Sequence, residues 1–261
     1  FVKLEKAPVT ITSRSIQEDI TWYDTIQEAI NASTSGATIT AWPGEYKENL
    51  DLGSKQIHLK SSDPASQTVR ETTIIDATGK DTCVISVGEA VAASSRGGIA
   101  YETIIEGFTI TGGNYIQDSI SDRGIFLPGS GIYVSNAYPV IRYNIIKSNI
   151  SPLGGGIYAE YQSFGISSRI SEPLKIYNNT ITNNAATGDE SKGGGIYLKE
   201  IQAQVYSNTI QNNTATKGGG MYLEGINYSN SRSMPQPKFK IYQNTIQNNT
   251  ASEKGAGICV G

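Results

Sequence analysis

Nine-residue segments that combine apolar and polar positions in a fixed order recur along the second half of the chain. Five of them align without gaps: IEGFTITGG (105–113), IRYNIIKSN (141–149), IYNNTITNN (176–184), VYSNTIQNN (205–213) and IYQNTIQNN (241–249). Each is followed by a second motif: SGIYV ending at Val134, GGGIY at 154–158 and 193–197, GGGMY at 218–222, and GAGIC at 255–259. Two linked motifs that recur in one order predict a stacked repeat architecture.

The alternation inside the segments favours strands over helices. In IYNNTITNN, Ile176 and Ile181 point to one side and Thr180 and Thr182 to the other, with a bend at Asn178–Asn179. Helical repeats would show apolar residues at a spacing of about 3.6 and would not contain Asn-Asn or Gly-Gly-Gly interruptions. We therefore expect each repeat to be one coil of short, stacked strands.

Asparagine and glycine occupy fixed columns of the alignment. One column holds an asparagine in four segments, at spacings of 35, 29 and 36 residues, and we expect a ladder in which each amide bonds to the next coil: Asn144, Asn179, Asn208 and Asn244. Gly and Asn most readily accept a positive φ, so we expect a left-handed turn at the last position of every segment: Gly113, Asn149, Asn184, Asn213 and Asn249.

The connections vary while the segments stay constant. The long excursions 114–130, 159–173 and 223–239 are rich in Ser, Gly, Asn and Pro and are expected to be loops. Upstream, WYDTIQEAINAS (22–33) places Ile26, Ala29 and Ile30 on one face, which predicts a short amphipathic helix with Thr25 or Asp24 as its N-cap. Short strands then follow, in ATITAWPGEYKENL, KQIHLKSS, ETTIIDATG and CVISVG. We expect one domain over 1–261, whose open N-terminal end is covered by a cap at about 1–35.

The C-terminal end interrupts the repeat. The sequence stops at Gly261, directly after GAGICVG, and terminal repeats normally need a cover. We expect either that the chain is a fragment of a longer protein, which we favour, or that its end stacks on a partner. In the first case the C-terminal face should self-associate, and a monomer mass independent of concentration would contradict this.

Composition and charge narrow the function classes. The chain has 28 Gly and 15 Tyr, only 17% charged residues and a net charge of −3. The absence of a basic run argues against nucleic-acid binding, and no apolar stretch approaches the roughly 18–20 residues of a membrane span. Several coils separate Cys83 from Cys259, so we expect no disulfide between them, since their Cα atoms would have to lie within about 7 Å.

Two groups of motifs resemble a known family. The strings TIQEAINASTSGATITAWPGEYKENL, TTIIDATG and IIEGFTITGG resemble the N-terminal half of pectate-lyase-like right-handed β-helix proteins. The later NTIQNNTATKGGGMY units are similar to generic parallel β-helix repeats, and to repeats of polymorphic outer-membrane proteins and autotransporter passengers. From about Trp22 onward the resemblance implies an all-β, single-stranded, right-handed parallel β-helix that works outside the cell or at its surface. Such repeats are found in polysaccharide lyases, glycoside hydrolases, epimerases, adhesins and structural stalks, so they leave the function open.

Catalytic candidates are few. The pectate-lyase resemblance implies a calcium cluster of Asp and Glu on a strand face with an Arg or Lys base, and the aligned segments lack it. Glu106 and Arg142 share a column on adjacent coils, where they form either a cross-strand ion pair or a general acid with an electrophilic partner. The lone His58 alternates with apolar neighbours and should face outward, which argues against a transition-metal site or a Ser-His-Asp triad.

The first long loop holds three further candidates. Asp118, Asp122 and Arg123 are either solvated turn residues or catalytic groups, and Asp118 with Asp122 could hold Ca²⁺, which prefers clustered oxygen ligands. We expect no other cofactor.

Tyrosines form two outward columns. One contains Tyr133, Tyr158, Tyr197 and Tyr222 and ends at Cys259; the other contains Tyr177, Tyr206 and Tyr242. The rings either pack on one another and shield the sheet, or present a regular stripe to an extended polymer, since tyrosine offers an apolar ring and a polar tip.

Three functions remain open at this point. The first is an extracellular or cell-surface module that binds polysaccharide or another surface polymer along its side. The second is a polysaccharide lyase or glycoside hydrolase whose active site is formed by the loops 114–130, 159–173 and 223–239. The third is a structural stalk or filament subunit without a ligand. A cleft of converging carboxylates with Arg or Lys would favour the second, an exposed tyrosine stripe the first, and fully covered tyrosine columns the third.

Overall fold

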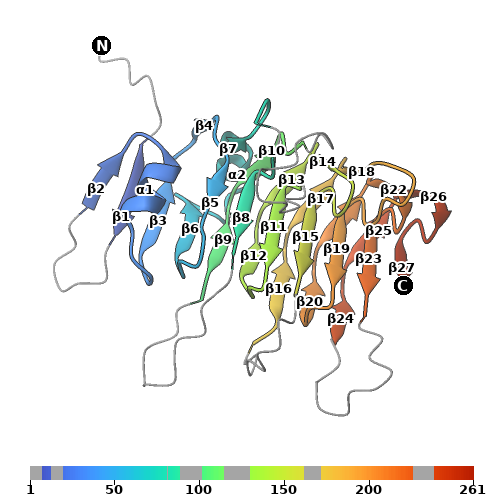
Figure 1. Cartoon of the computed structure of the whole chain (residues 1–261). Coiled ribbons are helices and arrows are strands. Elements are labelled where there is room, and N and C mark those ends of the chain that lie inside the picture. The colour runs from blue at the N-terminus through green and yellow to red at the C-terminus, as the bar shows by residue number, and fades with distance from the viewer. Residues whose placement is uncertain are drawn as a thin grey trace, which may run out of the picture.

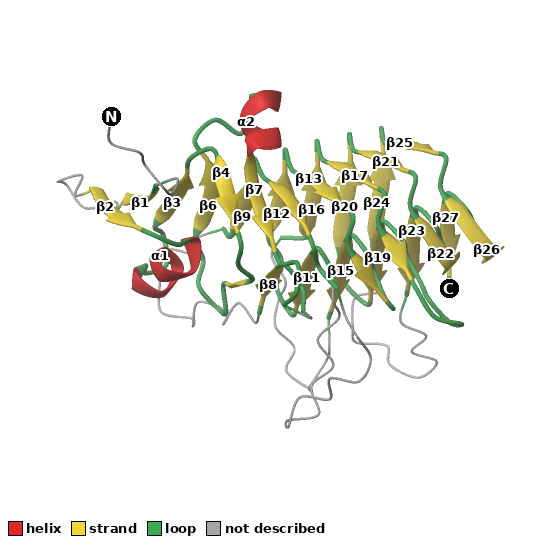
Figure 2. Ribbon diagram, turned by 90° about the horizontal axis from the view of Figure 1, so that it is seen from above, coloured by secondary structure: helices red, strands yellow, loops and turns green. Residues whose placement is uncertain are grey.

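The residues that the structure describes fold into a solenoid of short strands with two short helices (Figures 1 and 2). The computed structural model describes residues 8–12, 20–80, 82–88, 102–114, 130–161, 172–225 and 238–261. The strands assemble into one nine-stranded sheet, two seven-stranded sheets and one four-stranded sheet. We call these sheets A, B, C and D.

Successive coils contribute one strand each to sheets A, B and C, the last four coils also contribute one each to sheet D, and sheet A has two further strands at its N-terminal edge. Sheet A contains, in spatial order, β2 (Ile20–Tyr23), β1 (Val9–Thr12), β3 (Thr38–Ala41), β6 (His58–Ser61), β9 (Ile104–Glu106), β12 (Val140–Arg142), β16 (Leu174–Tyr177), β20 (Ala203–Tyr206) and β24 (Phe239–Tyr242). Sheet B contains β4 (Gly44–Tyr46), β7 (Thr73–Asp76), β10 (Thr109–Thr111), β13 (Ile145–Lys147), β17 (Thr180–Thr182), β21 (Thr209–Gln211) and β25 (Thr245–Gln247). Sheet C contains β5 (Leu50–Asp51), β8 (Ile85–Val87), β11 (Ile132–Ser135), β15 (Ile157–Glu160), β19 (Ile196–Lys199), β23 (Met221–Glu224) and β27 (Ile258–Val260). Sheet D contains β14 (Ile150–Ser151), β18 (Ala185–Ala186), β22 (Thr214–Lys217) and β26 (Thr250–Lys254).

One coil passes through the sheets in a constant order. The chain leaves sheet A at β12, enters sheet B at β13, passes sheet D at β14 and sheet C at β15, and returns to sheet A at β16. Neighbouring coils pair in parallel, with like residues over like: Ile141 pairs with Ile176, and Tyr158 with Tyr197. The predicted stacked β-coil architecture is therefore confirmed. Aliphatic side chains from sheets A, B and C fill one continuous core, and most of them are fully buried.

Two asparagine ladders run through the stack. The predicted ladder is confirmed: the amide of Asn179 donates to Oδ1 of Asn208 at 3.0 Å, and the same contact joins Asn208 to Asn244 at 2.9 Å. A second ladder was not predicted. It occupies the last position of the segments and comprises Asn149, Asn184, Asn213 and Asn249.

The predicted left-handed turns are misplaced by one residue. The positive φ lies at Gly112, Ser148, Asn183, Asn212 and Asn248, one position before the predicted column. The physical reason is the second ladder. The asparagines in the predicted column point their side-chain amides into the stack, so the residue before each of them adopts the positive φ instead. A further set of positive-φ residues precedes the first ladder: Gly107, Tyr143, Asn178, Ser207 and Gln243.

The N-terminal end is covered as predicted. Helix α1 (Ile26–Ala32) buries Ile26, Ala29 and Ile30, and the side chain of its N-cap, Thr25, accepts a bond from the Glu28 amide. The carboxylate of Glu48, one coil later, accepts from the free amides of Ile26 and Gln27 at 2.9 and 3.0 Å, which satisfies the start of the helix.

Two features of the N-terminal part were not predicted. Strands β1 and β2 extend sheet A with antiparallel pairs, whereas the rest of the stack is parallel. Helix α2 (Gln67–Thr72) forms a lateral excursion capped by Ser66. Neither carries the repeat motif that made the later coils recognisable.

The long excursions are slightly shorter than predicted, because β15 runs to Glu160, β23 runs to Glu224 and β24 begins at Phe239. Most of the three loops, and with them Asp118, Asp122 and Arg123, lies outside the described residues.

Candidate functional site

The outer face of sheet A carries one continuous column of side chains across all nine strands. The pairing register places these residues over one another: Trp22, Thr10, Thr40, Lys60, Glu106, Arg142, Tyr177, Tyr206 and Tyr242. We call this column the sheet A stripe. Its two ends are exposed and aromatic: Trp22 is 59% exposed and Tyr242 is 43% exposed.

The three tyrosines of the stripe stack face to face along the solenoid axis. The ring centroids of Tyr177 and Tyr206 lie 4.7 Å apart at an interplanar angle of 7°, and those of Tyr206 and Tyr242 lie 5.0 Å apart at 4°. Tyr206 therefore has both ring faces covered by stacked neighbours, which leaves its edge and hydroxyl for contact with a ligand. The predicted regular column of tyrosines on this face is present. Its surface is a row of phenol edges rather than a flat platform of ring faces.

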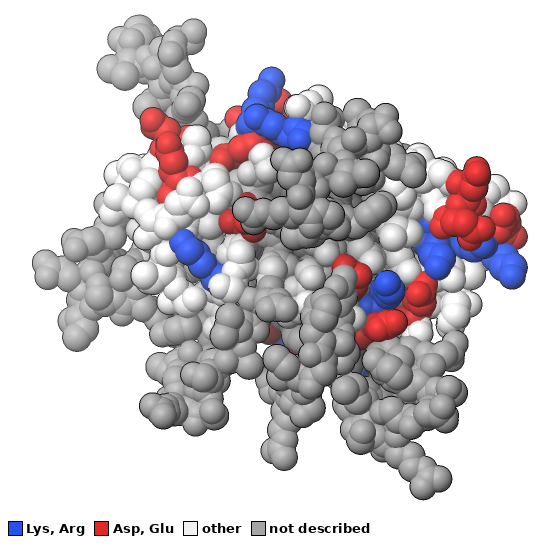
Figure 3. All heavy atoms as spheres, in the orientation of Figure 1, with Lys and Arg blue, Asp and Glu red and all other residues white. Residues whose placement is uncertain are grey.

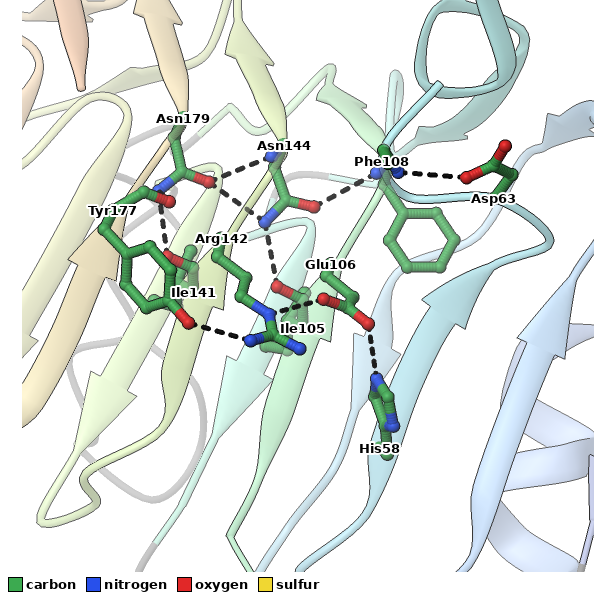
Figure 4. Close-up of polar contacts among 11 residues, drawn as sticks. His58, Asp63, Ile105, Glu106, Phe108, Ile141, Arg142, Asn144, Tyr177 and Asn179 are labelled. Atoms are coloured by element: carbon green, nitrogen blue, oxygen red, sulfur yellow. Dashed lines mark hydrogen bonds and ion pairs between the residues drawn. The ribbon is translucent and has the colours of Figure 1, made fainter. Parts of the chain in front are cut away.

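The middle of the stripe is a polar cluster drawn in Figure 4. Both oxygens of Glu106 are engaged: Oε1 contacts Nε2 of His58 at 2.7 Å, and Oε2 accepts from Nε of Arg142 at 2.5 Å. Nη1 of Arg142 donates to the hydroxyl of Tyr177 at 2.8 Å, so four consecutive coils are joined. The predicted cross-strand pair of Glu106 and Arg142 is thus present, and His58, expected only as a surface residue, belongs to it.

The Glu106 carboxyl group is held ionised. Burial, which leaves the residue only 6% exposed, would by itself raise its pKa, but hydrogen bonds from His58 and Arg142 together with their charges outweigh burial and lower it. A carboxyl group with a lowered pKa is a poor proton donor at neutral pH. The alternative in which Glu106 is a general acid therefore loses its physical basis.

The other tyrosine column lies on the outer face of sheet C and is buried. Tyr133, Tyr158, Tyr197 and Tyr222 are only 2–7% exposed and form an apolar cluster with Cys83, with Leu153 and Cys259 packed against it. The rings of Tyr158 and Tyr197 stack with centroids 5.0 Å apart. These four rings have no exposed face to offer a polymer.

Two glutamates accept hydrogen bonds from three of the four hydroxyls of this buried column. Glu160 accepts from Tyr133 and Tyr158, both at 2.8 Å, and Glu224 accepts from Tyr197 at 2.6 Å and from Lys192 at 2.9 Å. Burial, followed by the neighbouring glutamates, raises the pKa of all three phenols well above its usual value. The arrangement is that of a satisfied structural ladder.

Charged side chains elsewhere also pair with one another. Figure 3 shows a charged group at the end of the solenoid that carries β22 and β26. There Lys217 lies 2.7 Å from Glu190 and 3.4 Å from Glu253. Exposed pairs of this kind contribute little to stability.

The described ranges contain no grouped metal ligands and two free cysteines. Within them no three His, Cys, Asp or Glu side chains are grouped as a metal site would require. The Ca²⁺ prediction falls on Asp118 and Asp122, outside those ranges. Cys83 and Cys259 are both free thiols, which confirms that they do not pair.

The comparisons with known proteins agree with the geometry. A family described as "Right handed beta helix region" matches residues 55–261, which is most of the chain. The chain belongs to this right-handed β-helix family. Neither the curated proteins nor the solved structures gave a match. In the part of the chain that the structure describes, no helix is long and apolar enough to cross a membrane.

Proposed function

We propose that this right-handed β-helix is an extracellular or cell-surface module that binds an extended polysaccharide along the outer face of sheet A. The observation that carries the proposal is the sheet A stripe, an in-register column with exposed aromatic residues at both ends. Eight steps between neighbouring strands, each about 4.8 Å, give it a length of about 38 Å. A rigid track of this length matches a linear polymer better than a small molecule.

The chemistry of the stripe suits a hydroxyl-rich ligand. Threonine and tyrosine hydroxyls can both donate and accept hydrogen bonds, and aromatic rings add apolar area beside them. The neighbouring outward column supplies further polar groups in the same coils, from Lys175, Gln204 and Lys240. An apolar protein partner would need a larger hydrophobic surface than this face offers.

The other two functions have weaker support. Hydrolysis of a glycosidic bond usually needs a pair of carboxyl groups, one of them protonated. Glu106 is ionised, and the nearby Glu102 and Glu172 are both bound to Lys175 at 3.3 and 3.4 Å. A stalk without a ligand would account for the buried column of sheet C but not for the exposed ends of the sheet A stripe.

Binding can be tested with two matched double variants in a panel of soluble polysaccharides. Tyr206→Ala with Tyr242→Ala removes the exposed end of the stripe, whereas Gln211→Ala with Gln247→Ala alters the outer face of sheet B in the same two coils. We expect the first pair to weaken the affinity for the retained polymer about tenfold, or about 1.4 kcal/mol, and the second to leave it unchanged. Equal affinity of both double variants, or release of unsaturated or reducing ends by the wild-type protein, would contradict the proposal.

A further inference from the structure

Arg142 stands in the middle of the sheet A stripe with much of its hydrogen-bonding capacity unused. A guanidinium group has five N–H donors. Two are spent, one from Nε on Glu106 and one from Nη1 on Tyr177, and the other three have no acceptor among the described residues. The side chain is 30% exposed. The second Nη1 proton and the Nη2 protons form the fork that binds a carboxylate or a sulfate bidentately.

The guanidinium is held in place before any ligand arrives. Glu106 fixes its Nε side and is itself fixed by His58, while Tyr177 fixes Nη1 (Figure 4). The Tyr177 ring is in turn stacked on that of Tyr206. The Arg142 side chain also lies against aromatic rings, with its central carbon 5.9 Å from the Tyr177 centroid and 6.0 Å from that of Tyr143. Little rotamer freedom remains to be lost on binding, which favours affinity.

The carboxylate of Glu106 does not block this site. Its residue is only 6% exposed, and both oxygens already accept hydrogen bonds. An approaching anion therefore meets the outer edge of the guanidinium rather than the buried carboxylate. A fully neutralised ion pair of purely structural use would not account for three donors that lack an acceptor among the described residues, on a side chain that is 30% exposed.

The surrounding face is more basic than the chain. The two outward columns of sheet A contain four cations, Lys60, Arg142, Lys175 and Lys240, against Glu106 in the same columns and the flanking Glu102 and Glu172, which both pair with Lys175. Of these, Lys60 and Lys240 form no ion pair within the described ranges. The chain as a whole has a net charge of −3, so this face differs in sign from the average. Such a local positive field raises the local concentration of anionic ligands.

We propose that Arg142 binds an anionic group, a carboxylate or a sulfate ester, on the polymer that lies along the stripe. The inference rests on the proposed function, because it names the class of ligand that the same face binds. In this arrangement Arg142 contacts the ligand, whereas Glu106 and His58 are positioning residues.

Matched polymers test the inference directly. Dextran, carboxymethyl-dextran and dextran sulfate share one backbone, and hydroxyethyl-cellulose and carboxymethyl-cellulose share another. We expect the wild-type protein to bind at least one anionic member about tenfold more tightly than its neutral counterpart, with the two dextran derivatives separating carboxylate from sulfate preference. Retention of neutral and anionic members alike, or of no anionic member, would overturn the inference.

Three variants separate the fork from simple charge. Arg142→Lys keeps the positive charge but loses the planar fork, and should reduce the affinity for the anionic member about tenfold and the affinity for the neutral member by less. Lys147→Met removes an exposed cation from the outer face of sheet B and should change neither. Glu106→Gln removes a negative charge, so pure electrostatics predicts tighter binding of anions, whereas loss of the positioning contact predicts weaker binding. Tighter binding by Glu106→Gln, or wild-type affinity in Arg142→Lys, would refute the proposed role.

The outcomes also distinguish this inference from the proposed function. If Tyr206→Ala with Tyr242→Ala weakens binding to neutral and anionic polymers equally and Arg142→Lys weakens neither, the stripe binds polysaccharide and the anion subsite is wrong. If neither the tyrosines nor Arg142 matter, both are wrong. Circular dichroism of each variant shows whether a loss of binding is a loss of fold.

Discussion

Replacing Asn179 by alanine should be among the most destabilising single changes in the polar part of this fold. The residue is 2% exposed. Its Nδ2 donates to the carbonyls of Ile141 and Tyr177 and to Oδ1 of Asn208, at 2.9, 3.1 and 3.0 Å. Its Oδ1 accepts from the backbone amide and the side-chain amide of Asn144, at 3.0 and 3.2 Å.

The cost follows from what the substitution leaves behind. The buried amide of Asn144 loses its acceptor, and a buried group without a partner costs about 1–3 kcal/mol. The remaining lost bonds add roughly 1 kcal/mol of net stability. We therefore expect the free energy of unfolding to fall by about 2–4 kcal/mol. The exposed Asn31→Ala is the matched control, and should change it by less than about 0.5 kcal/mol.

Guanidinium chloride unfolding followed by circular dichroism measures the global effect, and hydrogen exchange of the Asn144 amide measures the local one. For Asn179→Ala we expect a lower denaturant midpoint at an unchanged slope and faster exchange of the Asn144 amide. A midpoint shift no larger than that of Asn31→Ala, with the Asn144 amide still protected, would show that the ladder does not stabilise the stack in the way its hydrogen bonds suggest.

Three further changes have directions set by the structure. The pKa of Glu106 is lowered on folding, so its contribution to stability is present above the unfolded pKa of about 4.3 and is lost as pH falls through the folded pKa. Glu106→Gln should therefore make the free energy of unfolding depend less on pH in this acidic range. An unchanged pH dependence would contradict this. Burial raises the pKa of the Cys83 thiol to about 11. A thiol reagent at pH 8 should therefore modify the partly exposed Cys259 quickly and Cys83 only after unfolding. Equal rates of modification at the two cysteines would show that Cys83 is not buried. Gly156→Ala would place a Cβ 2.5 Å from the Gly195 carbonyl oxygen on the next coil and should lower the free energy of unfolding by about 1–3 kcal/mol or more. Gly88→Ala is the control, because its Cβ would meet its nearest atom at 3.5 Å. Equal urea midpoints for the two variants would show that the coils are not so closely packed.

The sequence predicts the coils well because identical backbone environments repeat. In a parallel stack, one column of positions holds one kind of side chain. The column of Ile141, Ile176 and Val205 therefore predicts both the inward face of the strands and their pairing register. The helix at Ile26–Ala32 is predictable for a different reason, since its apolar spacing and its cap are local. By contrast, β1 and β2 have no repeat partner, and their antiparallel pairing depends on contacts that a column alignment does not contain.

Only part of the candidate site could be predicted from the sequence. The alignment places Glu106 over Arg142 and the three tyrosines after them, but it begins at residue 105 and so omits His58, which reaches Glu106 from a different outward column. Column position also says nothing about burial. Tyr158 and Tyr206 occupy equivalent outward positions on two sheets, yet the first is buried with its hydroxyl on Glu160 and the second lies in the partly exposed stripe.

The proposed function places a polymer along the outer face of sheet A. A crystal structure of the protein with an oligosaccharide taken from the polymer it retains tests this most directly. We expect an oligosaccharide that crosses successive strands of sheet A, in contact with Arg142 and with the edges of Tyr206 and Tyr242. An oligosaccharide bound on sheet B or sheet C, with these three side chains free of contact, would contradict it.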